Sequence, residues 1–545
     1  MGFGLNKAKP QRRKPVPLFI RPEFAFFRPS RLEWLPWRTL RGALDFVLSQ
    51  PHSATEEKVG LAYWVDRVLE EHSNVGGALP AQPIHDLRIS LRRCILIADV
   101  MMDLDPACDW KAMKKSARRT FQRLGTLRDT QVLTEWIEKL GAPGEASTVA
   151  LLEALKKRHE QERIDARAAI REFDRKQWRT WRREFAKHYR HVASDRPACE
   201  SLLLEIWEDV RGLNRRAQRS RSLLAYHRLR VGLKKFRYAV ENFLPSMYAG
   251  WAPDLKFLQD LLGEIHDLTV LDQIIVKSRS LFEESVFTAW RAKLQHERSL
   301  RLQQYREKMA GKASPLHVWR EGLPAEKDLR SAGLARFGEW ASFVTPDFPR
   351  VRRAARLSLQ LYDGLANCGL IAKESQIEER FILHAAALLQ EAGRFKKGKS
   401  YHKESYRMIR KVPPPPGWTK RDLEFTALVA RFHRRALPYP DHQKFRVYEM
   451  PLRQSLIRLA AILRLADAFQ TKSYRAIRRL QVENGPGFLI IRAEGFRDRD
   501  PINSKLSVAR RFLEFVCQRS VHILAPGTRM MVPRIVRPAK RSDAA

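Results

Sequence analysis

Apolar and polar positions alternate at helical spacing through most of the chain. From about residue 55 to 310, charged residues alternate with apolar ones in the rhythm of amphipathic helices, and strand signals are scarce. Further along, the pattern predicts one β-hairpin, Val482–Ala493, broken by Gly485-Pro486-Gly487. It also predicts helices at Val351–Leu361, Phe381–Leu389, Leu423–Arg435, Leu452–Phe469 and Val508–Cys517. The sequence therefore predicts a mainly α fold with a small β-hairpin.

One helical pattern occurs twice and places cations in a row. A helix advances about 100° per residue, so offsets of three and seven fall close to one line. Leucines fall on the neighbouring face in both copies, so each helix can bury one side and present cations on another. The first row holds His85, Arg88 and Arg92, with Arg93 beside it. The second holds His227, Arg230, Lys234 and Arg237, with Lys235 and Tyr238 beside it.

The two rows belong to a longer internal duplication. The segment Leu124-Gly125-x-x-Arg128-Asp129 follows the first row, and Leu262-Gly263-x-x-His266-Asp267 follows the second. The histidines that open the rows are 227 − 85 = 142 residues apart, and the Leu-Gly segments are 262 − 124 = 138 apart. Two ordered motifs at nearly one offset predict two similar helical halves, 55–195 and 196–310, related by a pseudo-two-fold axis.

The charge of the chain restricts its partners. Its 545 residues include 101 Lys and Arg against 61 Asp and Glu, a net charge of +40. Such a field attracts phosphate-rich partners: nucleic acid, inorganic polyphosphate or an anionic membrane surface. Residues 1–54 have the composition of a basic N-terminal arm, and we predict a domain boundary near residue 310, where a proline-containing linker begins.

The cysteines and the lengths of the apolar runs indicate the cellular compartment of the protein. The five cysteines are scattered and form no C-x-x-C pair, so neither a zinc knuckle nor a disulfide framework is expected. This composition fits a reducing, cytoplasmic location. No apolar run approaches the roughly 18 residues that span a bilayer, and we expect no membrane partner.

The two His-x-x-Arg helices and the two Leu-Gly segments make residues 55–310 resemble a CHAD domain, a conserved-histidine α-helical domain. Such a domain has two helical-bundle repeats, and the resemblance implies a turn at each Leu-Gly segment. The resemblance implies binding of inorganic polyphosphate in a basic channel or surface between the halves. Rows of Arg and Lys suit such a repeating anion, because Arg can bind two oxygens at once. By position, the implied binding residues are His85, Arg88, Arg92, Arg93, His227, Arg230, Lys234, Lys235, Arg237 and Tyr238.

Residues 311–545 resemble the C-terminal HD-like domain of the exopolyphosphatase/guanosine-pentaphosphate phosphohydrolase family. The segments that carry the resemblance are His384–Gly393, Tyr401–Ser405, Ala430–Arg434 and Leu463–Asp467. A working HD site holds divalent metal with a His, a His-Asp pair and a distant Asp. In this chain Arg350 stands at the first His, and Gln390-Glu391 stand at the pair.

These departures argue against a metal site and leave anion binding as an alternative role of the same region. Only His402 and Asp467 remain as weak metal candidates, and no cofactor is expected. The glycine-rich loop of the family's ATPase half is absent from the sequence. A second anion patch is predicted near His402, made of Arg394, Lys396, Lys397, Lys399 and Lys403.

Three functions follow as hypotheses. The first is non-catalytic binding of inorganic polyphosphate, which allows an association with polyphosphate granules. The second domain would then be an extra binding surface or a dimerisation unit, and in the latter case the protein is a homodimer. The second is a metal-dependent phosphohydrolase that acts on polyphosphate or nucleotides through the HD-like domain. The third is nucleic-acid binding, which charge alone permits, although no recognised nucleic-acid motif occurs.

Overall fold

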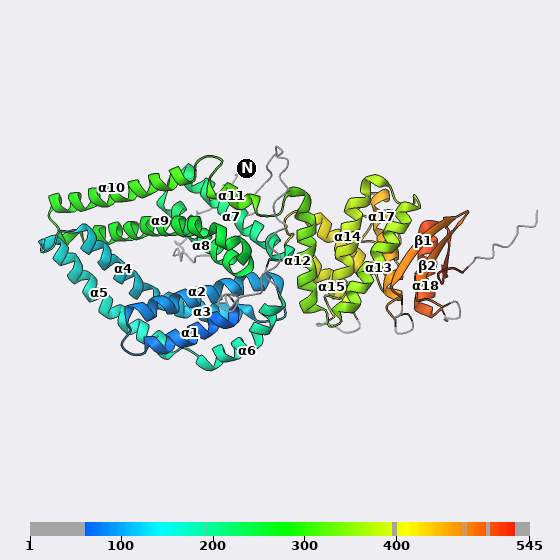
Figure 1. Cartoon of the computed structure of the whole chain (residues 1–545), viewed down its shortest axis with the longest axis horizontal. Helices are drawn as coiled ribbons and strands as arrows, with labels where there is room; N and C mark the ends of the chain where they lie inside the picture. Colours follow the sequence, from blue (N-terminus) through cyan, green and yellow to red (C-terminus); the bar gives the residue numbers. More distant parts are fainter. Residues whose placement is uncertain are drawn as a thin grey trace, which may run out of the picture. The chain divides into compact units, whose positions relative to one another are not determined.

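The computed structural model describes residues 60–192, 195–394, 400–471, 474, 477–497 and 502–528 (Figure 1). The predicted basic arm at 1–54 lies outside these ranges. Helices dominate the described residues, which confirms the mainly α fold. Among these helices, none combines the length and the apolar composition that a membrane span requires.

Helices α1 to α11 contain a duplication (Figure 1). Helix α1 packs against α2 as α7 packs against α8, and the pairs α4–α5 and α9–α10 also correspond. Helix α8 begins 223 − 81 = 142 residues after α2, the offset that the sequence predicts. The bounds are α1 Leu61–Val75, α2 Ala81–Leu104, α3 Trp110–Arg123, α4 Gly125–Leu140, α5 Ala146–Arg171, α6 Arg175–His191, α7 Pro197–Ser220, α8 Leu223–Phe243, α9 Pro245–Lys277, the 3₁₀ turn η2 Arg279–Leu281, α10 Glu284–Lys308 and α11 Pro315–Glu321.

The two Leu-Gly segments differ in backbone structure. Leu124 ends α3 and begins α4, so the first segment is the predicted turn. The second prediction is wrong, because Leu262 and Gly263 lie inside the uninterrupted helix α9. Thus one helix in the second half replaces the two helices α3 and α4 of the first.

Two apolar cores hold these helices together. The larger core joins α1, α2, α3 and α6 to α7, α8 and the first part of α9. The smaller core joins α4 and α5 of the first half to α9 and α10 of the second. The larger core continues past the boundary that we predicted near 310, because Trp319 of α11 is fully buried in it and Trp207 donates a hydrogen bond to the Leu316 carbonyl at 3.1 Å. The proline-containing stretch therefore starts as packed structure and not as a linker.

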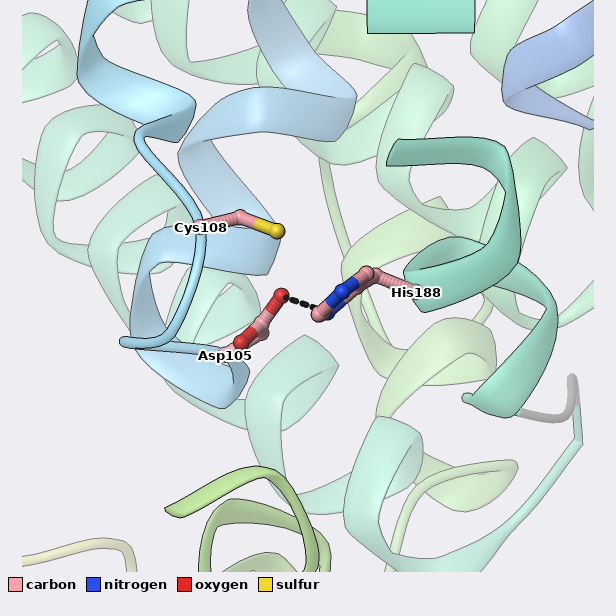
Figure 2. A group of neighbouring side chains, drawn as sticks. All are labelled: Asp105, Cys108 and His188. Carbon is pink, nitrogen blue, oxygen red and sulfur yellow. Dashed lines mark hydrogen bonds and ion pairs between the residues drawn. The ribbon is translucent and has the colours of Figure 1, made fainter. Parts of the chain in front are cut away.

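A buried carboxylate fixes the loop between α2 and α3 (Figure 2). Asp105 is fully buried, and its Oδ1 accepts a hydrogen bond from the Ala107 amide at 2.9 Å. Its Oδ2 accepts from the Trp110 indole and from Nδ1 of His188 on α6, both at 2.9 Å. The Cys108 thiol lies beside this carboxylate, and burial together with Asp105 raises its pKa to about 12. Asp105 thus joins α6 to the α2–α3 loop.

Replacing Asp105 by Ala is expected to destabilise the protein by on the order of 3 kcal/mol, because it leaves the buried Trp110 indole and the partly buried His188 ring without their acceptor. Chemical denaturation of the variant measures this cost. Asp165→Ala, at an exposed position of α5, is the matched control and should change the free energy of unfolding by less than about 0.5 kcal/mol. A cost for Asp105→Ala as small as the control's would contradict the assigned role.

The C-terminal helices surround a third apolar core. Helix α14 is buried along three consecutive alanines, 385 to 387, which lets α13, α16 and α17 pack closely on it. The bounds are η3 Glu326–Asp328, α12 Leu329–Val344, α13 Phe348–Asn367, η4 Lys373–Ser375, α14 Gln376–Leu389, α15 Tyr401–Ile409, α16 Lys420–Phe432, α17 Met450–Ala468 and α18 Ser504–Cys517.

The predicted hairpin is part of a three-stranded sheet in the order β1-β2-β3. Strands β1 (Arg479–Gly485) and β2 (Phe488–Glu494) are antiparallel, as predicted. Strand β3 (Ser520–Leu524) follows α18 and pairs with β2 in parallel, and the sequence analysis missed it. The apolar pattern of this strand is short, because only Val521 and Ile523 are buried in it.

Candidate functional site

The two cationic rows meet where α2 packs against α8 (Figure 1). Arg88 and Arg92 of α2 lie close enough to Arg230 and Lys234 of α8 for their charges to disfavour one another. Helices α4 and α9 contribute the residues of the Leu-Gly segments to the same place. We call this set the central cluster: His85, Arg88, Arg92, Arg128, His227, Arg230, Lys234 and His266, with the carboxylates Asp129 and Asp267.

The aromatic ring of Phe121 supports the first row. The Arg88 guanidinium lies 4.5 Å above this ring and donates from Nη1 to the Phe121 carbonyl at 3.1 Å. Arg92 lies 4.9 Å from the same ring. A Cβ at Gly125 would lie 2.8 Å from Nη1 of Arg88, so glycine in the Leu-Gly turn leaves the space that the guanidinium fills. The side chain of Arg88 is only 12% exposed, and burial lowers its pKa to about 10.

The second row is short of partners for its charges. Burial, together with Arg92 and Arg230, lowers the pKa of Lys234 to about 6. Among the described residues, Nε of Arg230 has no hydrogen-bond partner. The Nδ1 atoms of His227 and His266 are 3.1 Å apart, and burial with Arg230 lowers the pKa of His266 to about 3. These histidines are therefore neutral at pH 7, and one donates its Nδ1 proton to the other.

Only two carboxylates belong to the central cluster, against five Arg and Lys. Asp129 lies 3.9 Å from Arg88. Burial raises the pKa of Asp267 to about 6, although Arg230 and Lys234 oppose the shift. Repulsion between partly buried cations costs free energy, and a polyanion in contact with them would remove that cost. The arrangement is thus suited to hold an anion with several charged groups.

Three of the predicted binding residues, Arg93, Lys235 and Arg237, lie apart from the central cluster, and Tyr238 lies close to Arg230. Arg93 is 6% exposed, forms an ion pair with Glu241 and stacks on the Tyr238 ring at 4.2 Å, so both Arg93 and Tyr238 belong to the packing between α2 and α8. Lys235 is close to Asp103 and Asp209, on another side of α8. Arg237 hydrogen bonds to Tyr248.

The sequence analysis also left four members of the central cluster out of its binding set. These are Arg128 and Asp129 of α4, and His266 and Asp267 of α9. All four had been noted as motif residues of the duplicated Leu-Gly segments. Their repetition in register was the signal that could have assigned them to the site.

In the C-terminal domain, Arg350 lies between two buried acids. Its Nη1 donates to Oδ1 of Asp467 at 3.0 Å, and its Nη2 forms an ion pair with Glu391. Lys505 binds the other oxygen of Asp467 at 2.8 Å. Although burial opposes ionisation, Lys505, His433 and Arg350 hold the pKa of Asp467 below its usual value. The Asp467 carboxylate is therefore ionised, and both carboxylates are already paired with cationic side chains of the protein.

This donor set does not fit the divalent metal of an HD site. A guanidinium lies between Glu391 and Asp467, where a cation would repel an incoming ion. Gln390 at the His-Asp pair is buried, and no described residue hydrogen bonds to its side-chain amide. His402 and Asp467, the predicted weak ligands, do not belong to any group of three close ligands in the described residues.

One other group of side chains has metal-ligand chemistry: Asp105, Cys108 and His188, whose donor atoms lie within 4.8 Å of one another (Figure 2). The hydrogen bonds to both oxygens of Asp105 account for this arrangement without an ion. We therefore assign it to the packing of the loop.

The predicted second anion patch is only partly described. Lys396, Lys397 and Lys399 lie outside the described residues. Arg394 forms an ion pair with Glu391 at 3.0 Å, so its charge is shared with an acid. Lys403 lies in the first turn of α15 beside His402.

Comparison with protein families agrees with this architecture. Residues 36–276 match the family model of the CHAD domain. The duplicated helical region is a CHAD domain. Residues 343–485, which lie C-terminal to the CHAD match, match the model described as Ppx/GppA phosphatase, domain III. Both predicted resemblances are thus confirmed, and both domains are consistent with a polyphosphate-related function. The comparison with curated proteins gave no match.

Proposed function

We propose that the chain binds inorganic polyphosphate at the central cluster of its CHAD domain and does not hydrolyse it. The observation that carries this proposal is the convergence of Arg88, Arg92, Arg230 and Lys234 from two helices with few acidic partners. Linked phosphates repeat along a flexible chain, so one polymer can contact both rows at once. Arg and Lys bind such groups without any need to read bases.

The C-terminal domain is proposed to have no hydrolytic role. Its HD position holds Arg350 between the two carboxylates that a catalytic metal would need. A water molecule at this place would lack the metal that lowers its pKa toward neutrality. The second domain then serves binding or assembly.

A salt series with two competing polyanions tests the function. Long-chain polyphosphate and double-stranded DNA are compared at equal phosphate concentration, and free phosphate is followed with and without Mg²⁺ or Mn²⁺. We expect tighter binding of polyphosphate, an affinity that falls with salt through counterion release, and no phosphate release. Displacement of polyphosphate by DNA at equal concentration would contradict the preference, and metal-dependent phosphate release would favour the hydrolase hypothesis.

Binding of polyphosphate is expected to tighten as the pH falls from about 8.5 to 6, by up to about tenfold per pH unit for one proton taken up. The free protein keeps Lys234 largely neutral in this range, because burial and its cationic neighbours lower its pKa to about 6. A bound phosphate favours the ammonium form and raises that pKa, so binding takes up a proton. Titration calorimetry in buffers of different ionisation enthalpy measures the uptake.

The control for this pH dependence is Lys234→Arg, which stays charged throughout the range. It should flatten the profile between pH 6 and 8.5. The other His and Asp residues of the central cluster, on α2, α4, α8 and α9, are His85, Asp129, His227, His266 and Asp267. The pKa values of the three histidines are lowered and that of Asp267 is about 6, so these four groups act mainly below pH 6.5. An unchanged slope in Lys234→Arg would exclude Lys234 as the origin.

A further inference from the structure

A cavity of about 400 Å³ in the C-terminal domain is lined by positive charge. Its basic residues are His402 and Lys403 from the first turn of α15, Arg431 from the last turn of α16, and Arg434 and Arg435 just after that helix. None of its eight lining residues is acidic. Only Lys403 was part of the anion patch predicted from the sequence, so the cavity is a different set of residues.

His402, one of the residues that line this cavity, has a side-chain nitrogen without a partner. The residue is 7% exposed, and its Nδ1 is buried with no hydrogen-bond partner among the described residues. A buried ring nitrogen without a partner is costly, so a ligand that hydrogen bonds to it would remove the cost. Arg431 is in a similar state, because its buried Nε also lacks a partner in the described residues.

The backbone around the cavity also favours an anion. Ser400 precedes α15, and no side chain caps this helix, so the first-turn amides near His402 carry the positive end of the helix dipole. The opposite effect is expected at the end of α16, where carbonyls carry partial negative charge. Arg464 cancels it by donating hydrogen bonds to the carbonyls of Phe432, Arg435 and Ala436.

We propose that this cavity binds a short phosphate chain, and we name it the α15–α16 pocket. A volume of about 400 Å³ is on the order of a dozen water-sized groups, which accommodates a few linked phosphates but not a long polymer. The chemistry is shared by free inorganic oligophosphate and by the phosphates of a nucleotide. The pocket is a second site in another domain, and its existence does not depend on the central cluster.

The test uses full-length protein that carries Arg92→Glu and Lys234→Glu, so that the central cluster no longer competes. Calorimetry with inorganic tripolyphosphate should show a remaining site of about one per chain. Adding Arg431→Gln and Arg435→Gly should weaken it at least tenfold. Arg435 has a positive φ of 67°, a conformation that glycine adopts without strain, so this change removes charge without disturbing the backbone.

The matched control replaces Lys420 and Arg421 by Gln, two exposed cations at the other end of α16. It should leave tripolyphosphate binding unchanged. If the Arg92→Glu/Lys234→Glu variant unfolds, the pocket substitutions are made in the wild-type chain. There, tripolyphosphate should bind two classes of site before the substitutions and one class after them. Affinity that is unchanged by the pocket substitutions, or sulfate that binds as tightly as tripolyphosphate, overturns the proposal.

A second ligand identifies the source of the phosphates. ATP is titrated beside tripolyphosphate, since it carries the same phosphate chain on a nucleoside. Equal affinity supports a pocket that contacts phosphates alone. Tighter binding of ATP that is lost in Arg431→Gln supports a nucleotide as the ligand.

Discussion

Reversal of charge at Arg92 and Lys234 is expected to weaken binding of long-chain polyphosphate by at least about 100-fold at roughly 0.1 M salt. The two residues come from different halves of the duplication, and the charge of Arg92 lowers the pKa of Lys234. Each Glu removes a phosphate contact and places a repelling charge in a partly buried site, where electrostatic interactions are stronger than in water. The measurement is an equilibrium binding titration with each variant at several salt concentrations.

The slope of the logarithm of affinity against the logarithm of salt should also become shallower, because fewer counterions are released. The matched control is Arg228→Glu with Lys256→Glu, two exposed cations on α8 and α9 outside the central cluster. The control changes the net charge of the protein equally, so its loss of affinity measures the general field. Equal losses in the two variants would show that charge alone, and not the central cluster, determines binding.

The sequence predicted the rows of the central cluster except at Arg237, which hydrogen bonds to Tyr248. It did not predict which neighbours of the row residues belong to the cluster. Arg93 and Lys235 each follow a row residue directly, which places them about 100° away around the helix. The structure puts them against Glu241 and near Asp103 and Asp209, respectively. The helical angle alone was enough to separate Arg93 and Lys235 from the rows. The sequence analysis missed this because each follows another cation directly in the chain.

Other features depended on contacts that no local pattern encodes. Tyr238 falls within 40° of Lys234 by helical angle, yet it is 5% exposed because α2 covers that part of α8. The paired histidines, His227 and His266, are 39 residues apart. The turn predicted at Leu262-Gly263 was wrong because α9 is uninterrupted there, although the same Leu-Gly pair forms a turn in the first half.

The degenerate HD position shows a similar division between what the sequence could and could not predict. Alignment of the motif was enough to place Arg350 at a metal-ligand position and to expect repulsion of a metal. It could not reveal that the guanidinium would bridge Glu391 and Asp467, which are 41 and 117 residues away. The arginine therefore supplies positive charge between two acids that would otherwise repel each other.

Replacing Arg350 by Ala is accordingly expected to destabilise the protein by about 3–5 kcal/mol, the usual cost of breaking a buried ion pair from one side. The change leaves Glu391, 1% exposed, with one ion-pair partner in Arg394, and leaves Asp467 with Lys505. Two buried carboxylates then lack the cation that joined them. Chemical denaturation gives the free energy of unfolding of each variant.

A double-mutant cycle isolates the electrostatic part of this cost. Adding Glu391→Gln to Arg350→Ala removes one of the two carboxylates that lost the guanidinium, so the double variant should be more stable than the sum of the single changes predicts, by about 1–3 kcal/mol. Arg352→Ala is the matched control, since Arg352 is exposed on the same helix α13, and it should cost less than about 0.5 kcal/mol. Additive losses in the cycle would mean that Arg350 stabilises this domain through packing, and that its place between the two acids has no electrostatic role.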